Sequence, residues 1–184
     1  MEIDMQRDNL GTRQRGLSLV EMSATVAIVG ILAGTALPSL KNANQKRLLD
    51  GTAAQLASDL QYARSEAIAR RDGVRVSFHS MPGAACVVIH TGATADCQCG
   101  DDGAAQCSGA AALIKHSYFA SARGVGVTAN VASMRFDSTH GTVSPAGTVK
   151  VASVSGPAVN HVVSMLGRVR TCSPSGSASG YKAC

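Results

Sequence analysis

A long apolar segment with one carboxylate near its start dominates the first part of this sequence. Residues 17–40 follow a basic flank and form a run about as long as a helix needs to cross a bilayer. Glu21 is the fifth residue of that run. A charge inside a membrane helix is costly unless it finds a partner. We therefore expect an N-terminal apolar helix whose carboxylate pairs with another group when the helix leaves the lipid.

The residues around this carboxylate match a known processing site. From Gly16 to Glu21 the chain reads GLSLVE, which resembles the prepilin cleavage site of type IV pilins and type II secretion pseudopilins. The resemblance implies that prepilin peptidase cuts after Gly16 and that Leu17 becomes the mature, usually N-methylated, first residue. It also implies that Glu21 pairs with a neighbouring subunit's amino terminus in a filament. Leu17 departs from the commonest residue, phenylalanine, whereas Pro38 stands where family members carry a helix-bending proline.

An ordinary signal anchor or a cleaved secretory signal is the alternative for this segment. A secretory signal has a shorter apolar core and a cleavage site of small residues. The apolar run here is longer, and Glu21 would have no explanation. We therefore favour the prepilin interpretation.

Sequence patterns divide the chain into four parts. Residues 1–16 are the expected leader peptide, 17–40 the transmembrane and filament-core helix, 41–71 an amphipathic continuation of that helix, and 72–184 a β-rich globular domain. Gly30, Gly34 and Pro38 are expected to weaken or bend the helix. An apolar stripe at spacings of three and four predicts the face that packs on the globular part; it comprises Leu49, Ala53, Leu56, Leu60, Ala63 and Ala67. Cationic Arg70 and Arg71 followed by Gly73 as the cap predict the helix end.

After the helix the pattern changes to the alternation of β-strands. Apolar and polar residues alternate from Val74, and short β-type runs separated by Gly, Pro, Ser and Asn follow at residues 86–90, 113–119, 126–128, 131–136, 149–154 and 161–171. Residues 91–112 are rich in Gly, Ala and Asp and are expected to be a long loop pinned by disulfides. The predicted fold class is α+β: a long pilin helix followed by an all-β head, a two-sheet sandwich or half-open barrel. Residues 59–68 also resemble the helix end of the FimT/GspH branch of the pilin family.

Six cysteines follow the apolar segment, in a part of the chain expected outside the cytoplasmic membrane, where disulfides form. Six cysteines allow 15 pairings. Cys172 with Cys184 is the preferred pair, and Cys97 and Cys99 are too close in sequence to bridge each other comfortably. Cys86 would then bond Cys97, Cys99 or Cys107, with the other two paired.

The cysteines, aspartates and histidines of the sequence do not favour a metal or catalytic site. Zinc bound by Cys86, Cys97, Cys99 and Cys107 would lack a Cys-x-x-Cys pair, and the spacing of Asp96, Asp101 and Asp102 fits no dedicated calcium loop. The five histidines are scattered singly and fit no catalytic triad. We expect no metal, no cofactor and no enzyme activity.

The most informative soluble stretch is the basic segment at residues 167–170. If Val169 points inward in a strand, Arg168 and Arg170 point outward together and can each bind a phosphate with two hydrogen bonds. Gly167 permits a turn or a close backbone approach. The stretch resembles the Gly-Arg-x-Arg motif of FimT-type minor pilins, which bind DNA in natural transformation. The resemblance implies that Arg168 and Arg170 contact DNA, and Lys182, in the expected disulfide loop, extends the patch.

Together these features predict a minor pilin of a type IV pilus that binds DNA non-specifically and promotes its uptake. The alternative is a type II secretion pseudopilin, or a structural minor pilin that does not bind DNA. The expected partners are DNA, other major and minor pilins, prepilin peptidase and the inner membrane. The chain would span the inner membrane once and then join a pilus at the cell surface, with its head periplasmic or extracellular.

Overall fold

The computed structural model describes Gly16 and residues 18–184, except the side chains of residues 35–38. The leader expected at residues 1–15 and the predicted first mature residue, Leu17, lie outside this described part. The chain divides into two compact units, of which the first ends at Lys41 and the second comprises residues 42–184. One helix, α1 (Leu19–Arg70), contributes to both units and remains helical through Gly30, Gly34 and Pro38.

The part of α1 that belongs to the first unit carries its apolar side chains on the outside. Leu19, Val26 and Ile31 are among its exposed large hydrophobic residues. The helix is long and apolar enough to cross a membrane. Lipid or other helices would have to cover this surface, because water does not solvate such a run favourably.

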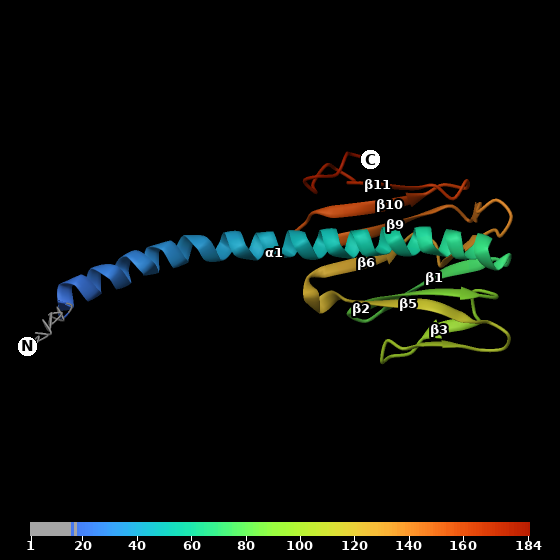
Figure 1. Ribbon diagram of the computed structural model, residues 1–184, viewed down its shortest axis with the longest axis horizontal. Helices are drawn as coiled ribbons and strands as arrows, with labels where there is room; N and C mark the ends of the chain where they lie inside the picture. The colour runs from blue at the N-terminus through green and yellow to red at the C-terminus, as the bar shows by residue number, and fades with distance from the viewer. Residues whose placement is uncertain (1–15, 17) are drawn as a thin grey trace, which may run out of the picture. The chain divides into compact units, whose positions relative to one another are not determined.

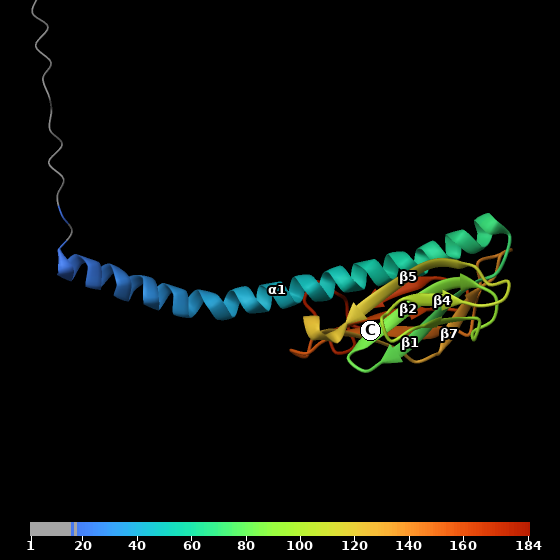
Figure 2. The same cartoon turned by 90° about the horizontal axis from the view of Figure 1, so that it is seen from below.

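The part of α1 in the second unit buries the apolar stripe that the sequence predicts. All six stripe residues are less than one-tenth exposed and pack in one core cluster with Val74, Phe136, Val151 and other strand residues. Figures 1 and 2 show this half of the helix running along the strands of the head. The stripe and the inner faces of the strands therefore form one hydrophobic core.

The helix ends differently from the sequence prediction. Its last residue is Arg70, and the left-handed residue after it is Arg71, with φ of +56°, rather than Gly73. Gly73 lies beside the guanidinium of Arg135, which occupies the space that a side chain at residue 73 would fill. Predicting Gly73 as the helix cap was therefore wrong.

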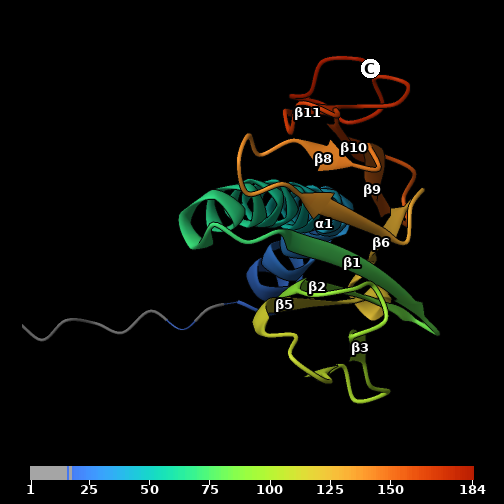
Figure 3. The ribbon, with the colours of Figure 1, turned by 90° about the vertical axis from the view of Figure 1, so that its right-hand side faces the viewer.

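The head contains two antiparallel sheets. The first has the order β5-β2-β1-β7-β8 and consists of β5 (Leu113–Ala120), β2 (Ala84–Thr91), β1 (Val74–Met81), β7 (Ser133–Phe136) and β8 (Val143–Ser144). The second has the order β11-β10-β9-β6 and consists of β11 (Val169–Cys172), β10 (Ala158–Val163), β9 (Gly147–Ser153) and β6 (Val125–Ala129). β6 contacts β1, β2 and β5, so the two sheets meet along that strand. Figure 3 shows β9, β10 and β11 on one side of the head and β2 and β5 on the other. The predicted α+β class with a β-rich head is confirmed.

Two parts of the strand prediction were wrong. Residues 91–112 are not one loop, because β3 (Cys97–Cys99) and β4 (Ala105–Cys107) pair there as a short hairpin. Residues 161–171 are not one strand, because β10 ends at Val163 and a turn precedes β11. A short 3-10 helix, η1 (Ser121–Arg123), also joins β5 to β6.

Three disulfides tie these elements together. They join Cys86 to Cys99, Cys97 to Cys107 and Cys172 to Cys184. The last is the pair preferred from the sequence, and the first two are among the pairings left open. Cys86, Val88 and Cys97 form a second small core that holds the β3–β4 hairpin against β2.

Asp59 is a buried carboxylate within the helix stripe. One of its oxygens lies 2.6 Å from the Lys115 ammonium, and the other accepts a hydrogen bond of 2.8 Å from the Ser117 hydroxyl. We expect Asp59→Asn to lower the free energy of unfolding by about 1–2 kcal/mol, because the amide removes the charge that both donors face. Since Lys115 is partly exposed, water moderates this loss.

Urea unfolding of the full chain in a neutral detergent, followed by far-UV circular dichroism, measures this effect. Glu66→Gln, which breaks the exposed pair between Glu66 and Arg70, is the matched control and should change stability by less than about 0.5 kcal/mol. Equal effects of the two substitutions would contradict the role of Asp59.

Candidate nucleic-acid interface

The turn between β10 and β11 positions the basic segment. The Ser164 amide donates to the Arg168 carbonyl at 3.0 Å, and the Gly167 amide donates to the Ser164 carbonyl at 2.8 Å. The Ser164 hydroxyl accepts a further bond of 3.3 Å from the Arg168 amide. Both ends of the turn are thus fixed by the chain's own hydrogen bonds.

Gly167 allows this turn to touch a second one. Its φ is +74°, and a side chain there would collide with the carbonyl oxygen of Gly141. The Gly141 turn is closed by a hydrogen bond of 3.0 Å that the Gly141 amide donates to the Asp137 carbonyl, and the Val143 amide donates to the Met165 carbonyl at 2.8 Å. The two turns are therefore packed backbone to backbone.

The carboxylate of Asp137 is committed to its own turn. It accepts hydrogen bonds from the amides of Thr139 and His140, at 2.8 and 3.1 Å. These two bonds, above all, lower the pKa of Asp137. Its charge thus stabilises the turn that Gly167 contacts.

Arg168 and Arg170 are both exposed, with the partly buried Val169 between them packed against the core. This is the alternation expected from the sequence, although Arg168 directly precedes β11 instead of lying within it. β11 is the edge strand of its sheet. Within residues 18–184 the ion pairs are Glu66–Arg70 and Asp59–Lys115, so neither of these guanidiniums has a carboxylate partner.

Lys182 is exposed and follows the same edge. The Ser173 amide, directly after β11, donates to the Lys182 carbonyl at 2.8 Å, and the Cys184 amide donates to the Ser173 carbonyl at 3.0 Å. The Cys172–Cys184 disulfide closes this loop. Arg168, Arg170 and the backbone of Lys182 therefore follow one another along one sheet edge, which we call the basic edge.

The surface around Arg75 and Arg135 is less suited than the basic edge to binding a polyanion. Arg75 and Arg135 face each other across β1 and β7, and burial together with the neighbouring Arg135 lowers the pKa of Arg75. The depression that they line also contains Asp72 and Asp96. Because the two carboxylates balance the two guanidiniums, this surface attracts polyanions less than the basic edge does.

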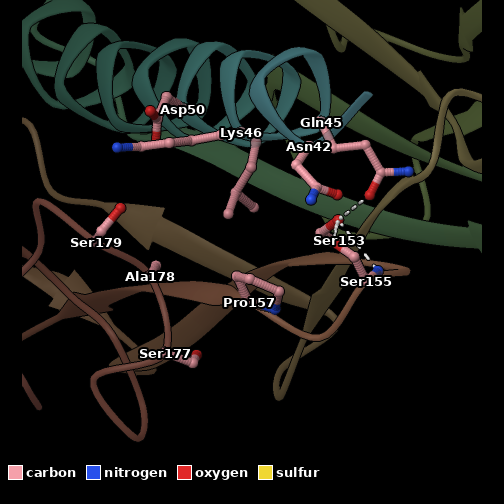
Figure 4. Close-up of a pocket in the computed structure, with 11 residues that line it drawn as sticks. Asn42, Gln45, Lys46, Asp50, Ser153, Ser155, Pro157, Ser177, Ala178 and Ser179 are labelled. Atoms are coloured by element: carbon pink, nitrogen blue, oxygen red, sulfur yellow. Dashed lines mark hydrogen bonds between the residues drawn. The ribbon is translucent and has the colours of Figure 1, made fainter. Parts of the chain in front are cut away.

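A polar pocket of about 260 Å³ lies beside residues 42–50 of α1 (Figure 4). The Ser153 hydroxyl in its wall lies 3.3 Å from the Gln45 amide oxygen and 2.8 Å from the Ser155 hydroxyl. Burial and the nearby Asp50 raise the pKa of Tyr181 at this end of the head. Its lining contains serines but no histidine, so the Ser–His pair of a serine hydrolase is not found there.

The cysteines have no free thiols to bind a metal ion, because all six are in disulfides. In the described part of the chain, no group of three or more His, Cys, Asp and Glu side chains is placed to hold a metal ion.

Glu21 lies in the first turn of α1, next to the residue that caps the helix. Gly16 and Glu21 are exposed, and the Glu21 amide donates to the Ser18 hydroxyl at 3.3 Å. Ser18 thus caps the helix, and Glu21 occupies the third helical position, where a carboxylate interacts favourably with the helix dipole. The Ser-x-x-Glu spacing is a known capping signal that the sequence reasoning did not use.

An exposed apolar N-terminal helix that continues into a disulfide-bonded head of antiparallel sheets defines a pilin-like protein. The prokaryotic N-terminal methylation motif matches residues 11–37, and the family described as type II transport protein GspH matches residues 52–167. The chain therefore belongs to the GspH family of pilin-like proteins. This class assembles with other pilins and is processed by prepilin peptidase.

Among solved structures, this chain is similar to the Pseudomonas aeruginosa (strain PAO1) type IV minor pilin FimU. The TM-score is 0.50 at 20% sequence identity, and the match covers 75% of this chain and 97% of that one. At this identity the likeness concerns the fold. No curated protein sequence matches this chain. The GspH match ends at Gly167, so the basic edge lies beyond it.

Proposed function

We propose that this chain is a minor pilin of a type IV pilus that binds DNA non-specifically through Arg168, Arg170 and Lys182 and promotes DNA uptake. One observation carries the proposal: two exposed guanidiniums, one on the edge strand β11 and one directly before it, have no carboxylate partner within residues 18–184. Guanidiniums held in this way bind phosphates without a large ordering cost. Few cations are involved, so one subunit should bind weakly and a filament more strongly.

The N-terminal residues supply the assembly steps of the proposal. Prepilin peptidase cuts after Gly16, Leu17 becomes the methylated first residue, and Glu21 pairs with the amino terminus of a neighbouring pilin. Before assembly the apolar helix anchors the chain in the inner membrane with its head in the periplasm. Retraction of the filament then carries bound DNA towards the cell.

A purely structural minor pilin or a type II secretion pseudopilin is the second candidate. Met165 and Leu166, in the turn that precedes Arg168, are 71% and 74% exposed. Adjacent exposed apolar residues favour a contact with another protein. The two candidates differ in whether the basic edge retains DNA.

An electrophoretic mobility shift with the full chain in a neutral detergent and a short DNA duplex tests the proposal. We expect the double variant Arg168→Ala/Arg170→Ala to bind about tenfold or more weakly at low salt, because two phosphate contacts are lost. The slope of log K against log salt should fall by about 2 for the same reason.

Arg123→Ala removes an exposed cation from η1, away from the basic edge, and is the matched control. It should leave both the affinity and the salt slope close to those of the parent protein. A parent protein that retains no DNA at low salt would favour the structural candidate. Equal binding by the parent and the double variant would place any DNA site elsewhere.

A further inference from the structure

An open groove of about 460 Å³ lies between the last turns of α1 and the turn before β11. The helix lines it with Gln61, Arg64, Ser65 and Ile68, and the turn lines it with Gly167 and Arg168. No acidic side chain is among the lining residues. The groove thus combines two guanidiniums with an amide and a hydroxyl, groups that donate hydrogen bonds to phosphate oxygens.

The side chain of Arg64 reaches this groove because two glycines leave space for it. A side-chain carbon at Gly141 would lie 2.7 Å from the Arg64 Nε, and one at Gly167 would lie 3.1 Å from it. Both distances are too short for ordinary packing. The glycine that precedes Arg168 therefore also determines where the Arg64 side chain lies.

Among the residues that the structure describes, Arg64 forms no ion pair. Its Nε is buried without a hydrogen-bond partner, and Arg64 is in neither of the ion pairs found in residues 18–184. The nearest acidic residue on the helix, Glu66, is paired with Arg70. Because the Nε is buried against the Gly141 and Gly167 turns, a ligand in the groove would meet the terminal nitrogens of the guanidinium.

We propose that Arg64 is a third phosphate contact and that this groove seats the phosphodiester backbone of DNA. The inference rests on the proposed function and extends it from the basic edge to the helix. Guanidiniums from two elements that pack together would hold the polyanion against the end of the head, with Gln61 and Ser65 beside it. The ligand class is a phosphodiester backbone, and no base-specific contact is involved.

Arg64→Gln tests the inference in the same mobility-shift measurement, with the full chain in detergent. We expect affinity for the duplex to fall about three- to tenfold at low salt and the salt slope to fall by about 1, as for one lost phosphate contact. Arg47→Gln is the matched control, because Arg47 is an exposed arginine of the same helix outside the groove. It should leave affinity and slope unchanged.

Ser65→Asp provides a second variant in case Arg64→Gln disturbs folding. Ser65 is exposed and lines the groove, so the new carboxylate should repel the backbone and weaken binding about tenfold, whereas Ser65→Asn should not. If neither Arg64→Gln nor Ser65→Asp weakens binding while Arg168→Ala does, the helix contact is wrong and the basic edge stands. If the parent protein does not bind the duplex, both proposals fail.

Discussion

Gly167→Ala is expected to lower the free energy of unfolding by about 2–5 kcal/mol, since it adds a collision between two turns to a strained backbone. The residue has φ of +74°, a conformation that costs an L-residue about 1–2 kcal/mol. The new methyl group would also meet the Gly141 carbonyl oxygen, which belongs to the backbone and cannot rotate away. The turns must separate, and the Val143–Met165 hydrogen bond between them weakens.

Gly83→Ala separates the two contributions. Gly83 has the same φ of +74°, yet nothing lies within 4 Å of the position of an added side-chain carbon. This variant should lose only the backbone term of about 1–2 kcal/mol. Urea unfolding of both variants measures the difference. Equal losses would mean that the contact between the two turns is loose, and that Gly167 serves the backbone conformation alone.

The sequence was most informative where one periodicity extended over many residues. The stripe from Leu49 to Ala67 predicted the buried face of α1 because each of its six members is small or apolar. Asp59 is the charged exception on that face, because it is buried there with the stripe. Strand alternation from Val74 predicted β1 for the same reason. Short elements were missed: β8 has two residues, and β3 and β4 have three each. A strand of two or three residues is too short to show a detectable period in the sequence. Its pairing with a neighbouring strand decides its structure.

The end of the helix and the basic segment show why local rules fail at contacts between distant residues. Gly73 is typical of a helix cap in the sequence, but Arg71 takes the left-handed conformation, and Gly73 lies beside the guanidinium of Arg135 from another strand. No motif in the sequence marks Arg64 as a site residue. Its proximity to Gly141 and Gly167 depends on how two turns pack on the helix, and no local pattern encodes that packing.

The head is expected to lose about 3 kcal/mol of stability from His161 alone as the pH falls from about 6.5 to 4. His161 is fully buried on β10, and its Nδ1 lies 3.0 Å from the Thr171 hydroxyl oxygen. Burial lowers the pKa of His161 to about 4, and the nearby backbone of Ala53 only partly offsets this shift. The unfolded chain therefore binds a proton at a higher pH than the folded chain. Stability is retained above pH 6.5 and falls as the pH approaches 4.

His90 should add to this acid sensitivity. Burial is also the main reason that the pKa of His90 is lowered. Its Nδ1 faces the Thr91 carbonyl at 2.8 Å, so Nδ1 carries the hydrogen and Nε2 accepts from the Ser77 hydroxyl at 2.9 Å. This neutral tautomer satisfies both ring nitrogens, and a second proton would displace the Ser77 bond.

Urea unfolding of the full chain at a series of pH values between neutral and about 4 distinguishes these histidines from other acid effects. His161→Gln should flatten the pH dependence by about 3 kcal/mol over this range, whatever its effect on stability at neutral pH. His116→Gln, at an exposed position of β5, should leave the pH dependence unchanged. If His161→Gln keeps the parent slope, protonation of the buried imidazole is not the cause of the acid loss.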